Sequence, residues 1–246
     1  MKTRSSEFIY GRNPVFELLS TDPRKIQKIY IQKGIKVEDK ILELAHENRI
    51  PISVLSKEKI KRLVGNVNHQ GVVARTYPIS LASPLGIARK TVEEKGMIVV
   101  VDHVEDPQNL GSIIRTAEVL GASGVIIPSR RSSPLSETVV KVSAGAVFHI
   151  PIAVVSNIRN FLRDFKEAEG FVVAVEIGGE NLFKFEFPFP LALVIGGEDK
   201  GVGRLILKES DFVVTIPMVG KTGSLNAANA IAIAMAFAAK SRPQNR

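Results

Sequence analysis

The sequence predicts an α/β fold in which a small α/β unit precedes a larger domain built on a mainly parallel sheet. From residue 96 onward, apolar runs of strand length alternate with helix-like segments, as in a sheet covered on both faces. The run MIVVVD, at residues 97–102, is continuously apolar, as expected of a strand buried on both faces. The 246 residues, 45% of them hydrophobic, suffice for one large domain or two modest ones.

The first part of the chain is predicted to be a compact α/β unit that ends near residue 76. Its predicted strands are residues 26–31, 52–55 and 71–77. A helix is predicted over residues 37–48, because Val37, Ile41, Leu44 and Ala45 share one face, and Ser56 begins a short Lys-rich helix. Residues 77–95 contain prolines and a glycine, which predict a linker running into a short helix.

The second part, from residue 96 to the end, carries the remaining predicted strands and helices. The strands are residues 97–102, 124–128, 152–155, 171–176, 191–196 and 211–217. Helices are predicted over residues 110–122, over 134–145, over 157–170 with Asn157 as the cap, and over the final Ala-rich segment. Alternation in that last segment resembles a strand, but its alanine content and length favour a helix.

Composition excludes several kinds of site. The chain has no cysteine, which excludes disulfides, thiolate metal sites and thiol nucleophiles, and its four histidines are not at metal-ligand spacing, so no metal is expected. The N-terminus lacks a signal-like apolar run. The longest uncharged stretch, Leu225 to Ala239, has 15 residues and is too short for a bilayer. We therefore expect a soluble cytoplasmic protein with no membrane partner.

Positive charge is concentrated in the first third of the chain. Residues 1–76 carry a net charge of +7, whereas residues 77–246 carry +1. Such asymmetry is typical of a protein in which one part faces a polyanion such as nucleic acid. A solvated Lys-rich surface is the alternative explanation.

Three common enzyme classes find little support. A dehydrogenase is disfavoured because the turn DHVEDPQNLG lacks the G-x-G-x-x-G pattern. A P-loop NTPase is disfavoured because Thr215 stands where the phosphate-binding loop requires glycine. Ser224 has no His–Asp arrangement near it in the sequence, so a serine hydrolase is unsupported.

The first of three segments that carry chemistry is residues 102–117, which begins where a predicted buried strand ends. Open α/β sheets bind ligands at that edge. Asp106 and Pro107 predict a turn, Asn109 is expected to cap the next helix, and Arg115 is expected at the margin of a buried face. A plain helix cap and a surface salt bridge are the alternative interpretations of Asn109 and Arg115.

The second and third segments also follow apolar strands. In residues 193–201, paired glycines allow close backbone approach to a ligand, and Glu198 follows them. In residues 216–226, an irregular Gly-rich loop leads to Ser224 and Asn226 at the mouth of the final helix. Tight turns with capping residues are the alternative. Together the three loops are predicted to line one cleft.

The segments NLGSIIRTA, IGGEDKG and IPMVGKTGSLNAA, in this order and spacing, resemble the three motifs of the SpoU family. These are S-adenosylmethionine-dependent RNA ribose 2′-O-methyltransferases of the SPOUT superfamily. The resemblance covers about residues 97–240, and the earlier stretch ending in NHQGVVA resembles the ribosomal-protein-like substrate-binding domain of large-subunit rRNA members. It implies an RNA-binding domain over 1–76, a linker over 77–95 and a methyltransferase domain over 96–246.

The resemblance also implies a C-terminal deep trefoil knot, an S-adenosylmethionine cofactor and an obligate homodimer whose active sites are each completed by the partner. The positions implied to hold the cofactor are Gly196, Ile216, Met218 and Leu225, through their backbone, with Ser143, Ala144 and Gly145 lining the same pocket. The positions that match the polar active-site residues are Asn109, Arg115, Glu198, Ser224 and Asn226.

The resemblance makes Arg115 essential and leaves two accounts of its role. As the general base it would need a strongly lowered pKa, because a guanidinium is normally always protonated. Alternatively it stays charged and binds the target phosphate while another group takes the proton. Ser224 and Asn226 are implied to orient the cofactor tail or the ribose, and Glu198 to hold Arg115 or the loop geometry.

The N-terminal domain favours 23S rRNA processing, and a guanosine of the peptidyl-transferase centre as target. A tRNA 2′-O-ribose methyltransferase is the alternative, as is a non-catalytic RNA-binding protein on the same scaffold, which the presence of Arg115 and Asn226 disfavours. Any need for accessory proteins stays open. The final helix, uncharged from Leu225 to Ala239, is expected at the dimer interface, with burial within its own monomer as the alternative.

Overall fold

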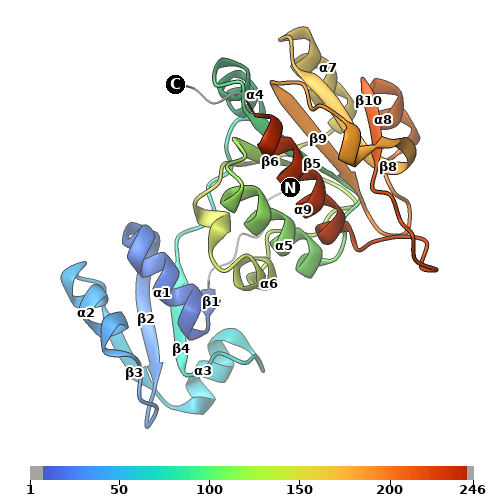
Figure 1. The fold of residues 1–246 in the computed structure, drawn as a ribbon. Helices are drawn as coiled ribbons and strands as arrows, with labels where there is room; N and C mark the ends of the chain where they lie inside the picture. Colours follow the sequence, from blue (N-terminus) through green and yellow to red (C-terminus); the bar gives the residue numbers. More distant parts are fainter. Residues whose placement is uncertain (1–7, 243–246) are drawn as a thin grey trace. The chain divides into compact units, whose positions relative to one another are not determined.

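The structure is a computed structural model that describes residues 8–242. The ends of the two predicted domains, residues 1–7 and 243–246, therefore lie outside the described residues. Contacts divide the chain into two compact units. The N-terminal unit comprises residues 1–79 with 134–149, and the C-terminal unit comprises residues 80–133 with 150–246 (Figure 1).

The N-terminal unit has a four-stranded mixed sheet with helices around it. Its elements are β1 (Phe8–Tyr10), α1 (Arg12–Thr21), η1 (Pro23–Lys25), β2 (Ile26–Gln32), α2 (Asp39–Glu47), β3 (Ile52–Leu55), α3 (Lys57–Val64), β4 (Val72–Thr76), α6 (Glu137–Val142) and η2 (Ala146–Phe148). The strand order is β1-β4-β2-β3, and only the β2–β3 pair of this sheet is parallel. The predicted strands and helices of this part are confirmed, whereas β1 and α1 were not predicted.

Helix α3 shows how the N-terminal unit separates its core from its charges. The hydroxyl of Ser56 accepts a hydrogen bond from Lys59 N, which caps the helix as predicted. One face of the helix buries Ile60 and Val64 against Tyr10 and Val73. The remaining positions expose its basic side chains, which are Lys57, Lys59, Lys61 and Arg62.

Residues 134–149 belong to the N-terminal unit by their contacts. Lys25 Nζ donates a hydrogen bond to the Phe148 carbonyl, and the Lys141 ammonium lies 5.5 Å from the centre of the Tyr10 ring. Of this segment only Glu137–Val142 is α-helical, so the helix is shorter than the predicted 134–145. The segment is thus distant in sequence from the strands on which it packs.

The C-terminal unit confirms the α/β class with a parallel sheet. Its elements are α4 (Pro84–Glu93), β5 (Met97–Asp102), α5 (Pro107–Val119), β6 (Gly124–Pro128), β7 (Ile152–Val155), α7 (Ile158–Glu167), β8 (Phe171–Asn181), η3 (Leu182–Lys184), β9 (Leu191–Gly196), α8 (Arg204–Glu209), β10 (Phe212–Thr215) and α9 (Ala227–Ser241). Six strands in the order β10-β8-β9-β5-β6-β7 pair in parallel throughout.

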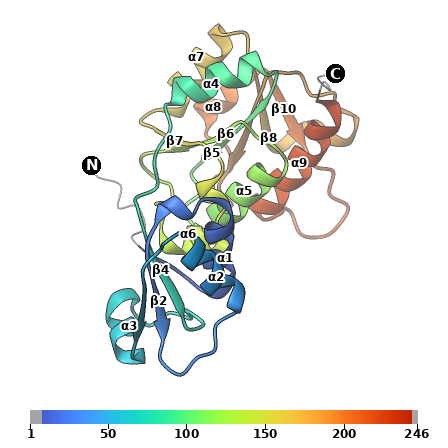
Figure 2. The same ribbon diagram turned by 90° about the vertical axis from the view of Figure 1, so that its left-hand side faces the viewer.

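Alternation along the strands assigns side chains to two covered faces (Figure 2). One face, including Ile98, Val100 and Val194, packs with α4, α7 and α8 in a single core. Helix α9 contacts β8, β9 and α5, and α5 contacts β6, which covers the other face. Strands β5 and β9 are buried along their whole length, as the continuous apolar runs predicted.

The start of α5 corrects one prediction. Asp106, not Asn109, is the N-cap, because its carboxylate accepts a hydrogen bond from Gln108 N, and Pro107 occupies the first helical position. Asn109 therefore lies in the first turn of α5. Because it does not cap the helix, its side chain can form other hydrogen bonds. Asp106 and Pro107 were expected only to form a turn, but the preference of proline for the first helical position makes the residue before it the cap.

The Ala-rich segment forms helix α9, as predicted. One face packs into its own unit, with Ala227, Ala228, Ile231, Ala234, Met235 and Ala238 buried. Among the described residues, the opposite face is only partly covered, because Asn229 and Ala236 are exposed and Ile233 and Phe237 are half-buried. Within residues 8–242, no helix is long and apolar enough to cross a membrane. The trefoil knot implied by the resemblance stays a prediction.

Candidate active site

The three segments singled out in the sequence meet in one hydrogen-bond network. Asn109 Nδ2 donates to Glu198 Oε1 at 3.0 Å. Asn226 Nδ2 lies 2.8 Å from Asn109 Oδ1 and 2.5 Å from Glu198 Oε1, and it is the donor to both. One side chain comes from each segment, so the prediction that these loops line one cleft is consistent with the geometry.

Local structure explains why these amides face the carboxylate. Asn226 caps α9 with its Oδ1, which accepts from Ala228 N and Asn229 N, and this leaves its Nδ2 directed away from the helix. Asn109 sits one turn into α5 because Asp106 supplies that helix's cap. Each asparagine is thus positioned by the start of a helix. Glu198 accepts hydrogen bonds from the amides of two different helices.

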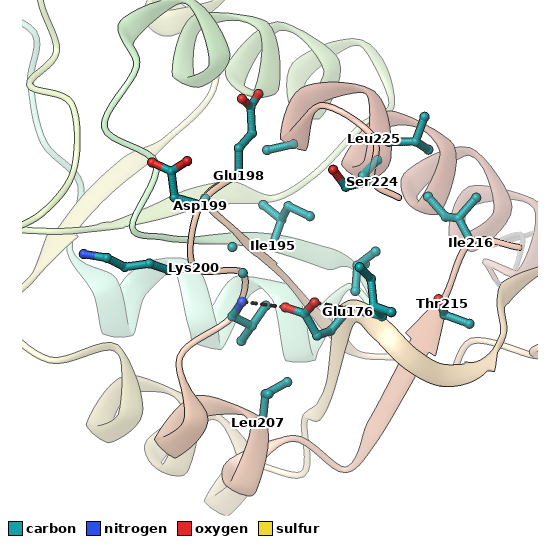
Figure 3. Close-up of a pocket in the computed structure, with 18 of the residues that line it drawn as sticks. Glu176, Ile195, Glu198, Asp199, Lys200, Leu207, Thr215, Ile216, Ser224 and Leu225 are labelled. Carbon is teal, nitrogen blue, oxygen red and sulfur yellow. Dashed lines mark hydrogen bonds between the residues drawn. The ribbon is translucent and has the colours of Figure 1, made fainter. Parts of the chain in front are cut away.

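A cavity of about 430 Å³ opens at the carboxyl ends of β8, β9 and β10 (Figure 3). Its lining includes four of the predicted cofactor positions, which are Gly196, Ile216, Met218 and Leu225, together with Glu198 and Ser224. In Figure 3, Ile195 and Ile216 line the cavity, while the Glu198 side chain points away from its floor. This is the sheet edge at which open α/β folds bind ligands, and the volume suits a nucleoside-sized molecule.

Glu176, at the end of the predicted strand 171–176, shapes the wall of this cavity. Its Oε2 accepts a hydrogen bond from Val202 N at 2.7 Å, and its Oε1 accepts from Ile177 N at 2.9 Å (Figure 3). Gly201 has φ +59° and lies so close to this carboxylate that a Cβ there would collide with it. Glu176 therefore holds the loop 197–202 against the sheet. It was not predicted as a site residue, and the structure places it within β8, which continues to Asn181 beyond the predicted strand end at residue 176.

A second, smaller cavity of about 190 Å³ adjoins the first. The two share five lining residues, which are Gly197, Glu198, Asp199, Lys200 and Ala227. The second is also lined by Asn109 and by His103, Val104, Glu105 and Asp106, from the loop after β5. The Asn109–Glu198–Asn226 network thus stands where the two cavities meet.

His103 and Asp102 form an acid–imidazole pair at the end of β5. Asp102 is only 3% exposed, its Oδ2 accepts a hydrogen bond from Gly203 N at 2.9 Å, and its Oδ1 lies 2.7 Å from His103 Nδ1. Among the described residues Nδ1 has this ion-pair contact but no aligned hydrogen bond. Neither residue was predicted to belong to the site, because a His beside an Asp is a weak signal until the fold shows where the pair lies.

The remaining predicted site residues lie elsewhere. Arg115 is on α5, is exposed, and lines neither of the two cavities. The hydrogen bonds of Glu198 go to asparagines rather than to Arg115. Ser143 and Gly145 belong to the N-terminal unit, where Ser143 is buried and its hydroxyl donates to the Val140 carbonyl. The cavity described above does not include them.

Two family models match the chain. Residues 96–236 match the SpoU rRNA Methylase family, and residues 8–81 match the family described as RNA 2′-O ribose methyltransferase substrate binding. Among curated proteins, YacO of Bacillus subtilis (strain 168), named for the TrmH family of tRNA/rRNA methyltransferases, is 38% identical over 238 residues, which cover 95% of each chain.

Solved structures share the architecture over nearly the whole chain. The SpoU methyltransferase AviRb from Streptomyces viridochromogenes, crystallised with the cofactor AdoMet, superposes with a TM-score of 0.77 at 25% identity, covering 96% of this chain and 90% of its own. An AdoMet-bound rRNA methyltransferase from Sinorhizobium meliloti gives 0.76 at 27% identity, covering 99% and 90%. The A. aeolicus TrmH/SpoU tRNA modifying enzyme covers 65% of this chain, with a TM-score of 0.54.

Proposed function

The chain belongs to the SpoU rRNA methylase family, and on that premise we propose that it methylates a ribose 2′-hydroxyl of RNA, with S-adenosylmethionine as methyl donor. The observation that carries this proposal is the network of Asn109, Glu198 and Asn226 at the junction of two cavities. The larger cavity suits the donor, and the smaller one gives the target ribose a place beside it. Both stand at the carboxyl edge of the sheet.

The residues around the larger cavity fit S-adenosylmethionine. Apolar side chains such as Ile195, Ile216 and Leu207 offer a surface for a purine ring, and backbone at Gly196 and Met218 is available for hydrogen bonds. The carboxylates Glu176 and Glu198 favour a cationic ligand. When bound, the cofactor supplies a methyl group already activated on a sulfonium. Ser143 and Gly145 stay predictions as further cofactor contacts, and Ser224 is proposed to orient the cofactor tail or ribose.

The protein's own task is then to position the ribose and accept its proton. The two asparagine amides hold Glu198 at the cavity junction, which keeps the loop after β9 in register with α5 and α9. Arg115 is proposed to enter the site from the partner of a homodimer, since it lines neither cavity of its own chain. A guanidinium fits a phosphate oxygen pair well, so a charged Arg115 suits the RNA backbone.

A homodimer is supported by helix α9 and its neighbourhood. Its outward face carries Asn229 and several apolar side chains and is partly exposed, with Ala236 exposed and Phe237 stacked on Phe183, which is itself 51% exposed. The exposed side chain of Ile177 also lines the cavity. Contiguous exposed apolar surface marks an interaction site. We propose that the outward face of α9 packs against the same unit of a second copy.

Within this family, we propose a guanosine of 23S rRNA as the target and rRNA processing as the role. The match of residues 8–81 to a substrate-binding family supports recognition of RNA by the N-terminal unit. The solved rRNA methyltransferase aligns with 99% of this chain, whereas the tRNA-modifying relative aligns with 65%, which favours rRNA. A tRNA substrate is the alternative.

The test is transfer of a labelled methyl group to defined RNAs. Purified protein is incubated with labelled S-adenosylmethionine and either unmodified 23S rRNA or unmodified total tRNA, and 2′-O-methylated nucleosides are identified by mass spectrometry. We expect 2′-O-methylguanosine in 23S rRNA. Product in tRNA alone would move the target to tRNA, whereas RNA binding without transfer to either RNA would indicate a non-catalytic RNA-binding protein.

A further inference from the structure

We propose that His103, paired with Asp102, is the group that takes the proton from the ribose 2′-hydroxyl. The proposal rests on the proposed 2′-O-methyl transfer and names the base that this transfer requires. It assigns proton transfer to the end of β5 and leaves Arg115 as a charged ligand. Three features support it, namely the burial of Asp102, the backbone of His103 and the position of the second cavity.

Asp102 is a buried carboxylate, and such a group needs compensating partners. It is 3% exposed, and its two oxygens have separate ones: Gly203 N–H donates to Oδ2, and His103 Nδ1 lies 2.7 Å from Oδ1. A carboxylate at Nδ1 favours a proton on that nitrogen and stabilises the imidazolium once the ring gains a second proton. The pair therefore directs the lone electron pair of the neutral ring to Nε2.

The backbone of His103 is held in an unusual conformation. His103 has φ +55°, in the left-handed region that L residues other than asparagine, aspartate and histidine seldom adopt. The Gly197 Cα lies against the His103 carbonyl so closely that a side chain on residue 197 would collide with it. Both constraints fix the backbone of His103 against the loop that carries Glu198. The geometry is built by the fold and not by the dipeptide alone.

His103 is one of the residues that line the second cavity. Nδ1 is buried, yet 23% of the His103 side chain is exposed, and His103 lines the cavity together with Asn109 and Glu198. The other charged groups at this cavity are Glu105, Asp106, Glu198, Asp199 and Lys200. Four of these five groups are carboxylates, so the lining of this cavity is predominantly acidic.

The other candidates for the base are less suited. Glu198 Oε1 already accepts two amide hydrogen bonds, which makes it a positioning group for the loop. Arg115 is exposed on α5 and, as a guanidinium, normally holds its proton. Imidazole is the side chain that ordinarily exchanges a proton near neutral pH. In unliganded enzymes the alignment of such pairs is often loose and tightens when substrate binds.

The proposed step conserves atoms and charge. The ribose O–H bond breaks and its proton goes to His103 Nε2, giving an imidazolium beside the Asp102 carboxylate. The ribose oxygen uses the freed electron pair to form the new bond to the methyl carbon. The electrons of the carbon–sulfur bond stay on sulfur, which becomes a neutral thioether. The imidazolium then releases its proton to water, which restores the neutral ring.

The ring's tautomer gives a readout that needs no activity. The chain has four histidines, so the ¹⁵N signals of the imidazoles are few enough to assign by replacing each residue. At neutral pH and without ligands, we expect His103 to carry its proton on Nδ1 in the wild type, and Asp102→Asn to shift the proton toward Nε2. A wild-type ring protonated on Nε2 would overturn the proposal, since that nitrogen could then accept nothing.

The kinetic test uses His103→Asn, because asparagine tolerates the left-handed backbone at this position. We expect kcat to fall about 100-fold, within the range ordinarily contributed by general bases, with the calorimetric Kd for S-adenosylmethionine and the RNA affinity unchanged. His46→Asn, on the exposed surface of α2, is the matched control and should keep wild-type kcat. A His103→Asn enzyme within about threefold of wild type would overturn the proposal.

Failure of the proposed function would look different. In that case wild-type protein would methylate neither rRNA nor tRNA, whatever the tautomer of His103. If His103→Asn loses cofactor binding, the test depends instead on the activity of Asp102→Asn and on the tautomer of His103 in the wild type. A proton on Nδ1 of wild-type His103, together with an Asp102→Asn enzyme that binds cofactor but turns over slowly, supports the proposal. A proton on Nε2 of wild-type His103 contradicts it.

Discussion

The two units of this chain use their charged residues in opposite ways. In the N-terminal unit, α3 presents Lys57, Lys59, Lys61 and Arg62 to solvent, and residues 1–76 carry a net charge of +7. In the C-terminal unit, the acidic groups Asp102, Glu176 and Glu198 are tied by hydrogen bonds to backbone or amide groups at one edge of a parallel sheet. Diffuse surface charge suits a polyanion, whereas fixed polar groups suit chemistry on a small part of it.

The difference has a structural cause. A sheet covered by helices on both faces offers polar groups little space except at its strand ends, so the C-terminal unit concentrates them there. The mixed four-stranded sheet of the N-terminal unit is small, and its ion pairs lie at the surface, as between Arg12 and Glu38. Such surface pairs contribute little stability, so those charges are free to serve binding.

The largest effect is expected from removing Arg115, which would separate catalysis from cofactor binding. Arg115→Ala should lower kcat by about 100-fold or more, because the variant has no charged group to stabilise the transferring centre or hold its phosphate. Binding of S-adenosylmethionine, measured by calorimetry, should be nearly unchanged, since Arg115 lies outside the cavity lining. Arg115→Lys is the control, and partial recovery of kcat would indicate a phosphate ligand. Turnover of the alanine variant within a few-fold of wild type would contradict an essential role.

The second effect concerns the proposed dimer of the C-terminal unit. Ala236→Glu, on the exposed face of α9, should raise the dimer dissociation constant at least about 100-fold, because an unpaired carboxylate would be buried. Sedimentation equilibrium measures this. A substitution of Ala234 would not test the interface, because Ala234 is fully buried within its own unit. Leu205→Glu, on the exposed surface of α8, is the matched control and should leave the dimer intact. A monomeric wild type at micromolar concentration would refute the interface.

A moderate effect is expected from neutralising the basic surface of α3. Replacing Lys57, Lys59, Lys61 and Arg62 by Gln should reduce the slope of log Kd against log salt by about 0.7–0.9 for each phosphate that the variant no longer binds. The kcat at saturating RNA should not change. The same replacement of Arg89, Lys90, Lys95 and Lys208, all exposed in the C-terminal unit, is the control. Equal weakening of RNA affinity in both variants would remove the contrast between the units.

Deletion of residues 1–76 is a less clean version of that test. Residues 134–149 pack in the same unit, so the deletion would uncover buried side chains such as Phe148 and Val140. Exposure of that apolar surface would destabilise the remaining chain for reasons unrelated to RNA. The point variants of α3 avoid this, because their side chains lie on the solvent face.

The smallest effect is a pH dependence confined to the N-terminal unit. Burial, and then repulsion by Lys57, lower the pKa of His69, whose Nδ1 accepts a hydrogen bond from Gly71 N at 3.0 Å. Since the folded state favours the neutral ring, this contribution to stability is present above the unfolded pKa of about 6.5 and is lost as the pH falls below it. The decrease in Tm between pH 7.5 and 5.5 should therefore be smaller in His69→Asn than in wild type. An equal decrease in both would exclude His69 as the cause.

Some site residues were predictable and others were not, for identifiable reasons. Gly196, Ile216 and Leu225 follow strands whose carboxyl ends meet, so both the motif resemblance and the sheet place them at one cavity. Asn109 was placed in the right segment with the wrong local role, because the choice between two helix caps depends on where Pro107 falls. His103 carried no local signal, since its importance rests on Gly197 and Gly203, which are far along the chain.

Most of the elements and the class of fold follow from the amino-acid order alone, although β1, α1 and α8 were not predicted. The period of the apolar residues identifies strands and helices, because burial of one face or two is a local pattern that repeats along each element. The excess positive charge of residues 1–76 and the cysteine-free composition are likewise properties of the chain before it folds.

Tertiary packing settles which side chains meet. Asn109 and Asn226 are 117 positions apart and Asn109 and Glu198 are 89 apart, yet one network joins them. Strand order β10-β8-β9-β5-β6-β7 brings their loops to the same edge, and no local pattern specifies that order. The same holds for residues 134–149, which pack with the N-terminal unit although their sequence follows a strand of the C-terminal one. Long-range contacts arise when whole elements pack together, and the periodicity of one segment does not indicate which other segment it packs against.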